Sequence, residues 1–265
     1  MERSRLLQCL AADYMRLRDV AGTGLTTPVP SCPGWTVTDL VRHVGQVYLH
    51  KAMVMRTGSW PAAWPPPETE TEHPIALLDR AYGALTHEFS RRGDTDPALT
   101  WHAPDQTVKF WIRRMAQESV IHRLDAELAL HTESDPIPDD LAVDGIDEVL
   151  RLFVGYGSHA WHEGFTEALA SAKGRMVRVQ ISPGGPAWLI RTDPDGATIT
   201  SGATPAAADQ PATPDASVTG DPASLLRWLW ARESTPLTDA HTSINVEGDG
   251  EAIKELRAML VASTQ

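Results

Sequence analysis

Cysteine is scarce in this chain of 265 residues, which contains only Cys9 and Cys32. Small secreted domains that depend on disulfide bonds carry more cysteines than this, so that class of protein is excluded. Two cysteines in a chain of this length fit the reducing cytoplasm, and we expect a cytoplasmic location. Both residues are expected to act as small hydrophobic side chains.

Long hydrophobic runs are also lacking. No segment approaches the roughly 18 consecutive apolar residues of a transmembrane helix, so we expect no membrane span. The N-terminal segment MERSRLLQCLAADYMRLRD is charged throughout and has no apolar core, so we expect no signal peptide.

Positive charge is in deficit, because 23 Lys and Arg stand against 35 Asp and Glu, a formal net charge of −12. A surface this negative repels phosphate groups, which disfavours both a nucleic-acid partner and docking on an anionic membrane. The composition, 42% hydrophobic and 22% charged, is that of an ordinary globular protein. The length predicts one large domain or two small ones.

Apolar residues at helical spacing dominate the first two thirds of the chain. They predict helices over 2–20, 36–57, 75–91, about 105–131 and roughly 139–172, the last broken near Gly155 and Gly157. The second helix should begin at Thr36, because Thr36-Val-Thr-Asp39 has the form of a capping box. The proline-rich segments 26–35 and 58–74 are predicted loops. Trp60 and Trp64 of the second loop either cover a site or belong to a surface linker.

The pattern changes after Lys173-Gly174. Alternating residues predict strands over 176–181, 187–191 and 197–200, a fourth from Ser217 and a fifth over 243–246. Helices are expected from Asp221 and over 250–261, and 201–216 is expected to be a flexible excursion. We therefore predict a two-domain α+β protein, with a helical domain over 1–172 and a small α+β domain over 173–265.

Polar residues interrupt the apolar stripe of the fourth predicted helix. One face carries, at alternating spacings of three and four, Val108, Trp111, Met115, Glu118, His122, Asp125 and Ala129. A buried Glu beside a buried His needs a partner, because burying an unpaired charge is costly. The second helix has a similar interruption, since His43 lies among Leu40, Val47 and Val54, with His50 one turn further.

Two helices that point such side chains into one bundle indicate a metal site. Two imidazoles and one carboxylate are the protein ligands of a catalytic zinc with one open position, and the same set binds non-haem iron. Spacing alone leaves open a core histidine and a surface Glu–His pair. Asp125 either orients an imidazole or forms an ion pair with Arg123 or Arg114.

Several motifs are similar to one known family. Pro30-Ser-Cys-Pro-Gly-Trp35, Thr36-Val-Thr-Asp-Leu40 and His43-Val-Gly45 resemble the N-terminal signature of the mycothiol-dependent maleylpyruvate isomerase-like proteins. The segment from Trp111 to Glu127 resembles the family's second signature. Segments 220–232 and 246–249 resemble its small C-terminal domain. The resemblance implies a DinB-like four-helix bundle followed by a sterol-carrier-like α+β domain.

The resemblance also implies a site and two cofactors. The family's metal ligands fall on His43, Glu118 and His122, and the implied metal is zinc. The implied thiol is mycothiol, a small thiol of actinobacteria. An arginine of the C-terminal domain is implied to bind an acidic substrate, with Arg232 as the first candidate and Arg227 as the second.

We expect an enzyme in which the metal activates a small-molecule thiol for addition to an electrophile. The outcome is isomerisation, as in maleylpyruvate isomerase, or transfer of the sulfur. Two alternatives are a zinc hydrolase that activates water and a non-catalytic metal-binding protein of stress response or regulation.

Overall fold

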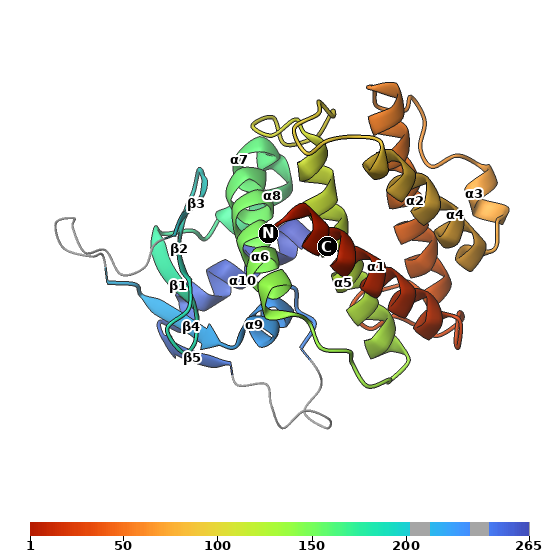
Figure 1. Ribbon diagram of the computed structural model, residues 1–265. Helices are drawn as coiled ribbons and strands as arrows, with labels where there is room; N and C mark the ends of the chain where they lie inside the picture. Colours follow the sequence, from red (N-terminus) through yellow and green to blue (C-terminus); the bar gives the residue numbers. More distant parts are fainter. Residues whose placement is uncertain (202–212, 234–243, 265) are drawn as a thin grey trace. The chain divides into compact units, whose positions relative to one another are not determined.

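The computed structural model describes residues 1–201, 213–233 and 244–264 (Figure 1). The chain divides into two compact units, Met1–Asp135 and Pro136–Gln265. The expected boundary at 172/173 lies inside the second unit, because the helices of residues 139–169 pack on the C-terminal sheet and its helices. The predicted α+β class with a helical N-terminal region is confirmed.

The first unit is a bundle of four long helices. They are α1 (Arg3–Ala21), α2 (Val37–Thr57), α4 (Pro74–Ser90) and α5 (Val108–Ala129). Helix α2 packs along α4, α1 packs along α5, and α2 also contacts α5. All four helices were predicted from their apolar spacing, with ends that differ by no more than a few residues.

Local signals set both ends of α2. Thr36 Oγ1 accepts a hydrogen bond from the backbone N–H of Asp39, and Asp39 Oδ2 accepts one from the backbone N–H of Thr36, so the predicted capping box is present. At the other end Gly58 has φ of +67°, a left-handed conformation that glycine adopts without a steric penalty.

The predicted loop over 58–74 contains one regular element that the proline count obscured. Residues Glu68–Thr71 form the single-turn helix α3. Its buried Thr69 accepts a hydrogen bond from Gln46 Nε2 at 2.9 Å, and its carbonyl oxygen accepts one from Arg42 Nε at 3.1 Å. The expectation of no regular structure here was wrong, because side chains of α2 hold this turn in place.

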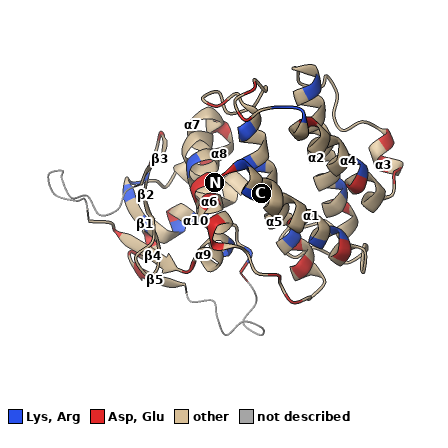
Figure 2. Cartoon of the chain, in the orientation of Figure 1, with Lys and Arg blue, Asp and Glu red and all other residues tan. Residues whose placement is uncertain are grey.

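A buried ionic network joins α1 to α5. Arg123 donates to Asp13 Oδ1 and to Glu127 Oε2, both at 2.9 Å, and Arg16 Nε lies 2.9 Å from Glu127 Oε1. Figure 2 shows acidic and basic segments next to one another on these helices. Burial raises the pKa of Asp13 to about 6, although Arg123 opposes the shift. The network fixes how α5 lies against α1.

The second unit combines helices with a mixed sheet. Its helical segments are α6 (Asp139–Glu148), the π-helical segment η1 (Val149–Tyr156), α7 (Gly157–Ala160), α8 (His162–Leu169), α9 (Pro222–Leu229) and α10 (Gly250–Thr264). Its strands are β1 (Arg175–Ile181), β2 (Ala187–Asp193), β3 (Gly196–Ser201), β4 (Ala216–Gly220) and β5 (Asn245–Gly248). The order is β3-β2-β1-β4-β5, with β1 and β4 parallel and the other pairs antiparallel.

The helices of this unit lie on one side of the sheet (Figure 1). Val177 and Val179 of β1 are buried, with the less covered Arg178 between them, and α10 contacts β1, β2 and β4. The predicted strands are confirmed. Most of the predicted excursion 201–216, and Ser243 at the start of the fifth predicted strand, lie outside the described residues.

The predicted break near Gly155 and Gly157 was wrong. Both residues are helical, and the helix is interrupted at Trp161 instead, where φ is −126° and ψ is 43°. A Cβ on Gly155 would lie 3.0 Å from the side chain of Ile199, and one on Gly157 would lie 3.2 Å from the ring of Trp161. These glycines allow close packing, and they do not end the helix. None of the described helices combines the length and the apolar character that a membrane crossing requires.

Candidate metal centre

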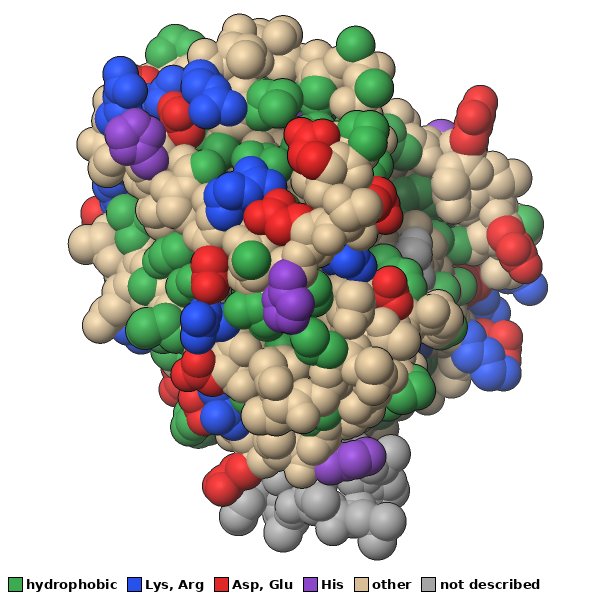
Figure 3. All heavy atoms as spheres, turned by 90° about the vertical axis from the view of Figure 1, so that its right-hand side faces the viewer, with side chains coloured by type: hydrophobic (Ala, Val, Ile, Leu, Met, Phe, Trp, Pro, Cys, Tyr) green, Lys and Arg blue, Asp and Glu red, His purple; other side chains and the backbone are tan. Residues whose placement is uncertain are grey.

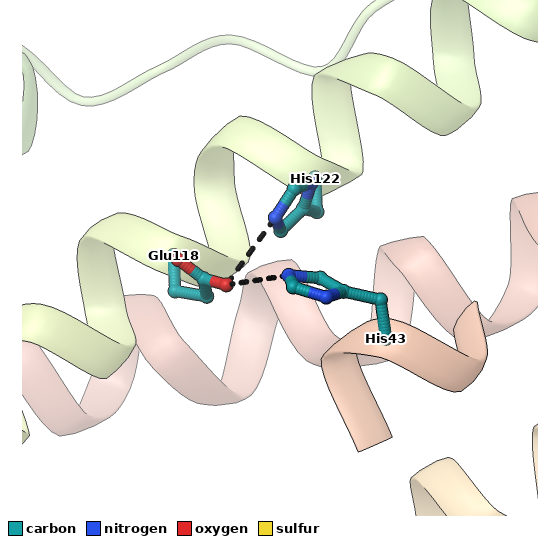
Figure 4. Close-up of side chains that lie close together, drawn as sticks. All are labelled: His43, Glu118 and His122. Carbon is teal, nitrogen blue, oxygen red and sulfur yellow. Dashed lines mark ion pairs between the residues drawn. The ribbon is translucent and has the colours of Figure 1, made fainter. Parts of the chain in front are cut away.

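Helices α2 and α5 bring three predicted ligands together (Figure 4). Glu118 Oε1 lies 3.3 Å from His43 Nε2 and 3.3 Å from His122 Nε2. One ligand atom from each residue lies within 4.8 Å of the others. In the part of the chain that the structure describes, this is the one group of three such side chains that could hold a metal ion.

The distance from Glu118 Oε1 to each imidazole nitrogen fits a shared metal ion. Zinc binds nitrogen and oxygen ligands at about 2.0–2.2 Å, and tetrahedral geometry then places neighbouring ligand atoms about 3.3–3.5 Å apart. The side chain of His43 is 38% exposed, whereas those of Glu118 and His122 are 14% and 12% exposed. The site is therefore open to solvent on the His43 side, where a further ligand could enter.

The side chain of Asp125 orients His122. Its Oδ2 lies 2.9 Å from His122 Nδ1, and the carboxylate is fully buried. An ionised Asp125 accepts the Nδ1–H, which leaves Nε2 unprotonated and directed at the site in the neutral imidazole. Ser31 donates to Asp125 Oδ1 at 2.5 Å, and Cys32 Sγ lies 3.7 Å from Oδ2. Of the two roles that the sequence left open for Asp125, the structure shows the contact with the imidazole.

The second oxygen of Glu118 is held by Arg114. Arg114 Nη2 donates to Glu118 Oε2 at 2.7 Å, so that Oε1 remains for the histidines. Burial by itself would raise the pKa of Glu118, but His122, His43 and Arg114 together hold it well below its usual range. The carboxyl group of Glu118 is therefore ionised at neutral pH.

The same charges act on His122. Burial lowers its pKa, but the attraction of Glu118 and the hydrogen bonds to Asp125 and Glu118 outweigh burial and raise the pKa to about 9. Without a metal, the ring of His122 carries a proton at neutral pH. A metal that binds Nε2 must displace this proton.

The motif Pro30-Ser-Cys-Pro-Gly-Trp35 supports the site from outside the helices. The ring of Trp35 lies 5.0 Å from that of His43, and Ser31 reaches Asp125. Gly34 between them has φ of +85°, a conformation that favours glycine, and it turns the chain toward α2. The motif thus contacts both histidines of the candidate site, His43 directly and His122 through Asp125.

His50, the second histidine of the predicted α2 face, lies elsewhere. It stacks on Trp60 with ring centroids 5.6 Å apart and meets Trp64 edge-on at 4.8 Å. The two tryptophans of the proline-rich loop therefore cover His50 near the C-terminal end of α2. Sequence spacing placed His43 and His50 on one face, but the packing separates their surroundings.

The two candidate arginines belong to the second unit. Arg232 is buried, and its Nη1 donates to the carbonyl oxygen of Trp230 at 2.6 Å. Arg227 lies in the last turn of α9, and its carbonyl oxygen accepts a hydrogen bond from the backbone N–H of Arg232 at 2.8 Å. A role for either in binding substrate remains a prediction.

Sequence reasoning missed the contacts of Ser31 and Lys51, and it did not consider an ion pair between Arg114 and Glu118. Arg114 lies four residues before Glu118, a spacing that predicts an ion pair on a helix and was available in the sequence. Figure 3 shows the side of the molecule that carries α2 and α4, where acidic and basic side chains are interspersed among hydrophobic ones.

Comparison with known proteins identifies the family. Residues 7–127 match the model of the mycothiol maleylpyruvate isomerase N-terminal domain, and residues 140–254 match that of the MDMPI C-terminal domain. No curated protein matches the chain at a significant level of sequence similarity.

Two solved structures resemble the chain over most of its length. The mycothiol-dependent maleylpyruvate isomerase is 14% identical with a TM-score of 0.58, and a histidine-to-alanine mutant of that enzyme is 13% identical with a TM-score of 0.59. Each match covers 94% of this chain and 95% of the other. The UbiJ-SCP2 ubiquinone synthesis protein is 14% identical, covering 50% of this chain and 98% of that one. Its TM-score of 0.31 is too low to test the sterol-carrier-like expectation. The two domain matches and the shared fold show that this chain belongs to the mycothiol-dependent maleylpyruvate isomerase family of enzymes.

Proposed function

We propose that His43, Glu118 and His122 bind a zinc ion and that the protein is a mycothiol-dependent enzyme acting on an electrophilic small molecule. The observation that carries the proposal is the equal distance of 3.3 Å from Glu118 Oε1 to the two imidazole nitrogens, which suits one tetrahedral ion. Membership of the family supports the choice of mycothiol.

Zinc bound here would supply a positive charge and one open coordination position, at which a small-molecule thiol is held as its thiolate at neutral pH. The protein's own residues prepare that position. Asp125 fixes the ring of His122, and Arg114 holds one oxygen of Glu118 so that the other faces the histidines. The exposed edge of His43 leaves room for the thiol to enter.

A thiolate that adds to a conjugated double bond turns it into a single bond. Rotation about that bond and elimination of the thiolate then give the other geometric isomer and regenerate the thiol. Displacement of a leaving group would instead leave the sulfur on the product. The family favours isomerisation, and we propose that Arg232, or failing it Arg227, binds an acidic group of the substrate.

Metal analysis and calorimetry test this proposal. Purified protein is expected to hold about one equivalent of zinc, and H43A and H122A are expected to lose it. H73A is the matched control, because His73 is an exposed histidine of the same unit and should keep its metal. Full zinc content in H43A would disprove the ligand set.

Titration with mycothiol separates the enzyme classes. Zinc-loaded protein is expected to bind mycothiol and metal-free protein is not. If the zinc-loaded protein ignores mycothiol but hydrolyses test esters or amides, the metal activates water and the protein is a hydrolase. If it does neither, a non-catalytic metal-binding role replaces the enzyme proposal.

A further inference from the structure

One basic side chain of α2 near the candidate metal centre forms no ion pair with a carboxylate of the described residues. Lys51 of α2 is partly buried, and in the described part of the chain no carboxylate forms an ion pair with its ammonium group. Its Nζ lies 3.3 Å from Nδ1 of His50 and 4.8 Å from the centre of the Trp111 ring. Partial burial of a charge without an ion-pair partner is unfavourable, so this ammonium group lowers the stability of the fold.

The neighbours of Lys51 hold its ammonium group in place without forming an ion pair with it. Burial, reinforced by Lys51, lowers the pKa of His50 to about 4, so His50 is a neutral imidazole that accepts a hydrogen bond from the ammonium. The face of Trp111 adds a cation–π contact, and Trp111 itself is fixed, because it is fully buried and donates to the carbonyl oxygen of Leu99 at 3.0 Å.

This group belongs to the same helix pair as the metal centre. Lys51 lies eight residues after His43 on α2, which is about 12 Å along the helix axis, and side chains on a helix lean toward its N-terminal end. Trp111 lies on the stripe of α5 that carries Glu118. Burial lowers the pKa of Lys51 to about 8, the negative charge of Glu118 opposes this shift, and the positive charge of Arg114 adds to it, so both side chains lie near the ammonium.

The surroundings indicate what kind of group the ammonium binds. The ring of Trp111 lies 4.8 Å from the ammonium, and Trp60 and Trp64 pack on the neighbouring His50, so the surroundings of the His50–Lys51 pair are aromatic. A positive charge repels cations, whereas a carboxylate on a flat, unsaturated carbon chain matches both the ammonium and the aromatic rings. The net charge of the chain is −12, so the protein as a whole does not attract anions. An anionic substrate therefore needs a cationic side chain at its binding position.

We propose that Lys51 Nζ binds a carboxylate of the electrophilic substrate while the reacting carbon of that substrate lies at the metal centre. Lys51 is then a substrate-binding residue that selects acidic electrophiles. This inference rests on the proposed function for the identity of the ligand. What it adds is a substrate-binding residue in the helical unit, for substrates that carry a carboxylate.

Titration with an unreactive dicarboxylate tests the inference. Succinate and its neutral diamide, succinamide, are titrated into zinc-loaded wild-type protein, K51M and K109M, with zinc content measured for each. Wild-type protein and K109M, which loses an exposed lysine of α5, are expected to prefer succinate by tenfold or more. K51M is expected to bind succinate at least tenfold more weakly and to lose most of this preference. K51R retains the charge and is expected to retain the preference.

The inference is overturned if K51M prefers succinate as strongly as wild-type protein does, or if wild-type protein shows no preference. K51Q is a second neutral variant in case K51M fails to fold. Mycothiol titration of the same samples separates this result from the proposed function. Loss of the succinate preference in K51M with no mycothiol binding in any sample would leave Lys51 as an anion site and disprove the thiol enzyme. Mycothiol binding together with an unchanged succinate preference in K51M would support the thiol enzyme and disprove the role of Lys51.

Discussion

Asp125 Oδ2 lies 2.9 Å from Nδ1 of His122, on the opposite side of the imidazole from Glu118. The buried carboxylate selects which ring nitrogen is free to bind a metal, and Ser31 holds the carboxylate in turn. The loop that precedes α2 thereby acts on His122 of α5 through one hydrogen-bonded chain, from Ser31 through Asp125 to the imidazole.

Removing the charge of Asp125 should weaken zinc binding without removing a ligand. D125N is expected to lower the zinc affinity about 10–100-fold, because the orienting acceptor is weakened. Competition with a chromophoric chelator measures the affinity. S31A is the milder comparison, because it removes a support of Asp125 and leaves the carboxylate on the imidazole. A D125N affinity equal to that of the wild-type protein would show that Asp125 does not orient His122.

Zinc binding should depend on pH through His122. Its pKa of about 9 in the metal-free site means that zinc displaces a proton at every lower pH. Glu118 adds nothing to this dependence near neutrality, because its pKa lies well below its usual range. Between about pH 6 and about pH 8, the apparent affinity for zinc should rise about tenfold per pH unit for every proton that zinc displaces. Proton release measured in buffers of different ionisation enthalpy checks this, and a flat profile would contradict it.

Replacing Lys51 should stabilise the fold. Burial lowers the pKa of Lys51 from 10.5 to about 8, and a shift of this size amounts to at most about 3 kcal/mol against the charged form. K51M is therefore expected to unfold at higher urea concentration than wild-type protein at neutral pH. K109M should stay within about 0.5 kcal/mol of wild-type protein.

The sign of the pH dependence follows from the same shift. Between about pH 8 and 10.5 the unfolded chain binds more protons at Lys51 than the folded chain, so the stability of wild-type protein relative to K51M should rise with pH across this window. Below about pH 8 the difference should be constant. A relative stability that falls with pH would show that the fold favours the charged lysine.

Breaking the ionic network between α1 and α5 should be costly. R123M leaves Asp13 and Glu127 buried with one partner fewer, and we expect a loss of about 3–5 kcal/mol in the free energy of unfolding. Urea denaturation measures it. The matched control is R91M, which removes an exposed arginine of the same unit and should change stability by less than about 0.5 kcal/mol.

The two arginines of the C-terminal unit can be separated by kinetics. R232M is expected to raise KM for an acidic electrophile, with R227M less affected, while zinc content and mycothiol binding stay unchanged in both. Thermal unfolding of each variant controls for stability, because Arg232 is buried against Trp230. A larger effect in R227M would transfer the role to Arg227, and no effect in either would remove both.

The sequence alone determined much of this protein. Helical spacing, the capping box at Thr36 and the stop at Gly58 located α2, and alternating residues located the strands, because these are local signals of the backbone. The stripes on two helices also singled out His43, Glu118 and His122, because each helix has one periodicity and polar residues stand out on an apolar face.

The tertiary structure decided which side chains actually meet. Periodicity says which residues share a face of one helix, but not how far that helix is shifted or rotated against its neighbour. That is why His43 reaches Glu118 whereas His50, on the same predicted face, lies under two tryptophans. It is also why Lys51, an ordinary lysine in the sequence, lies over Trp111 without an acidic partner in the described residues. The shift and rotation of packed helices depend on contacts between residues that are distant in sequence. One such contact is the close approach of Gly45 on α2 to Leu77 and Leu78 on α4, which only the folded chain brings together.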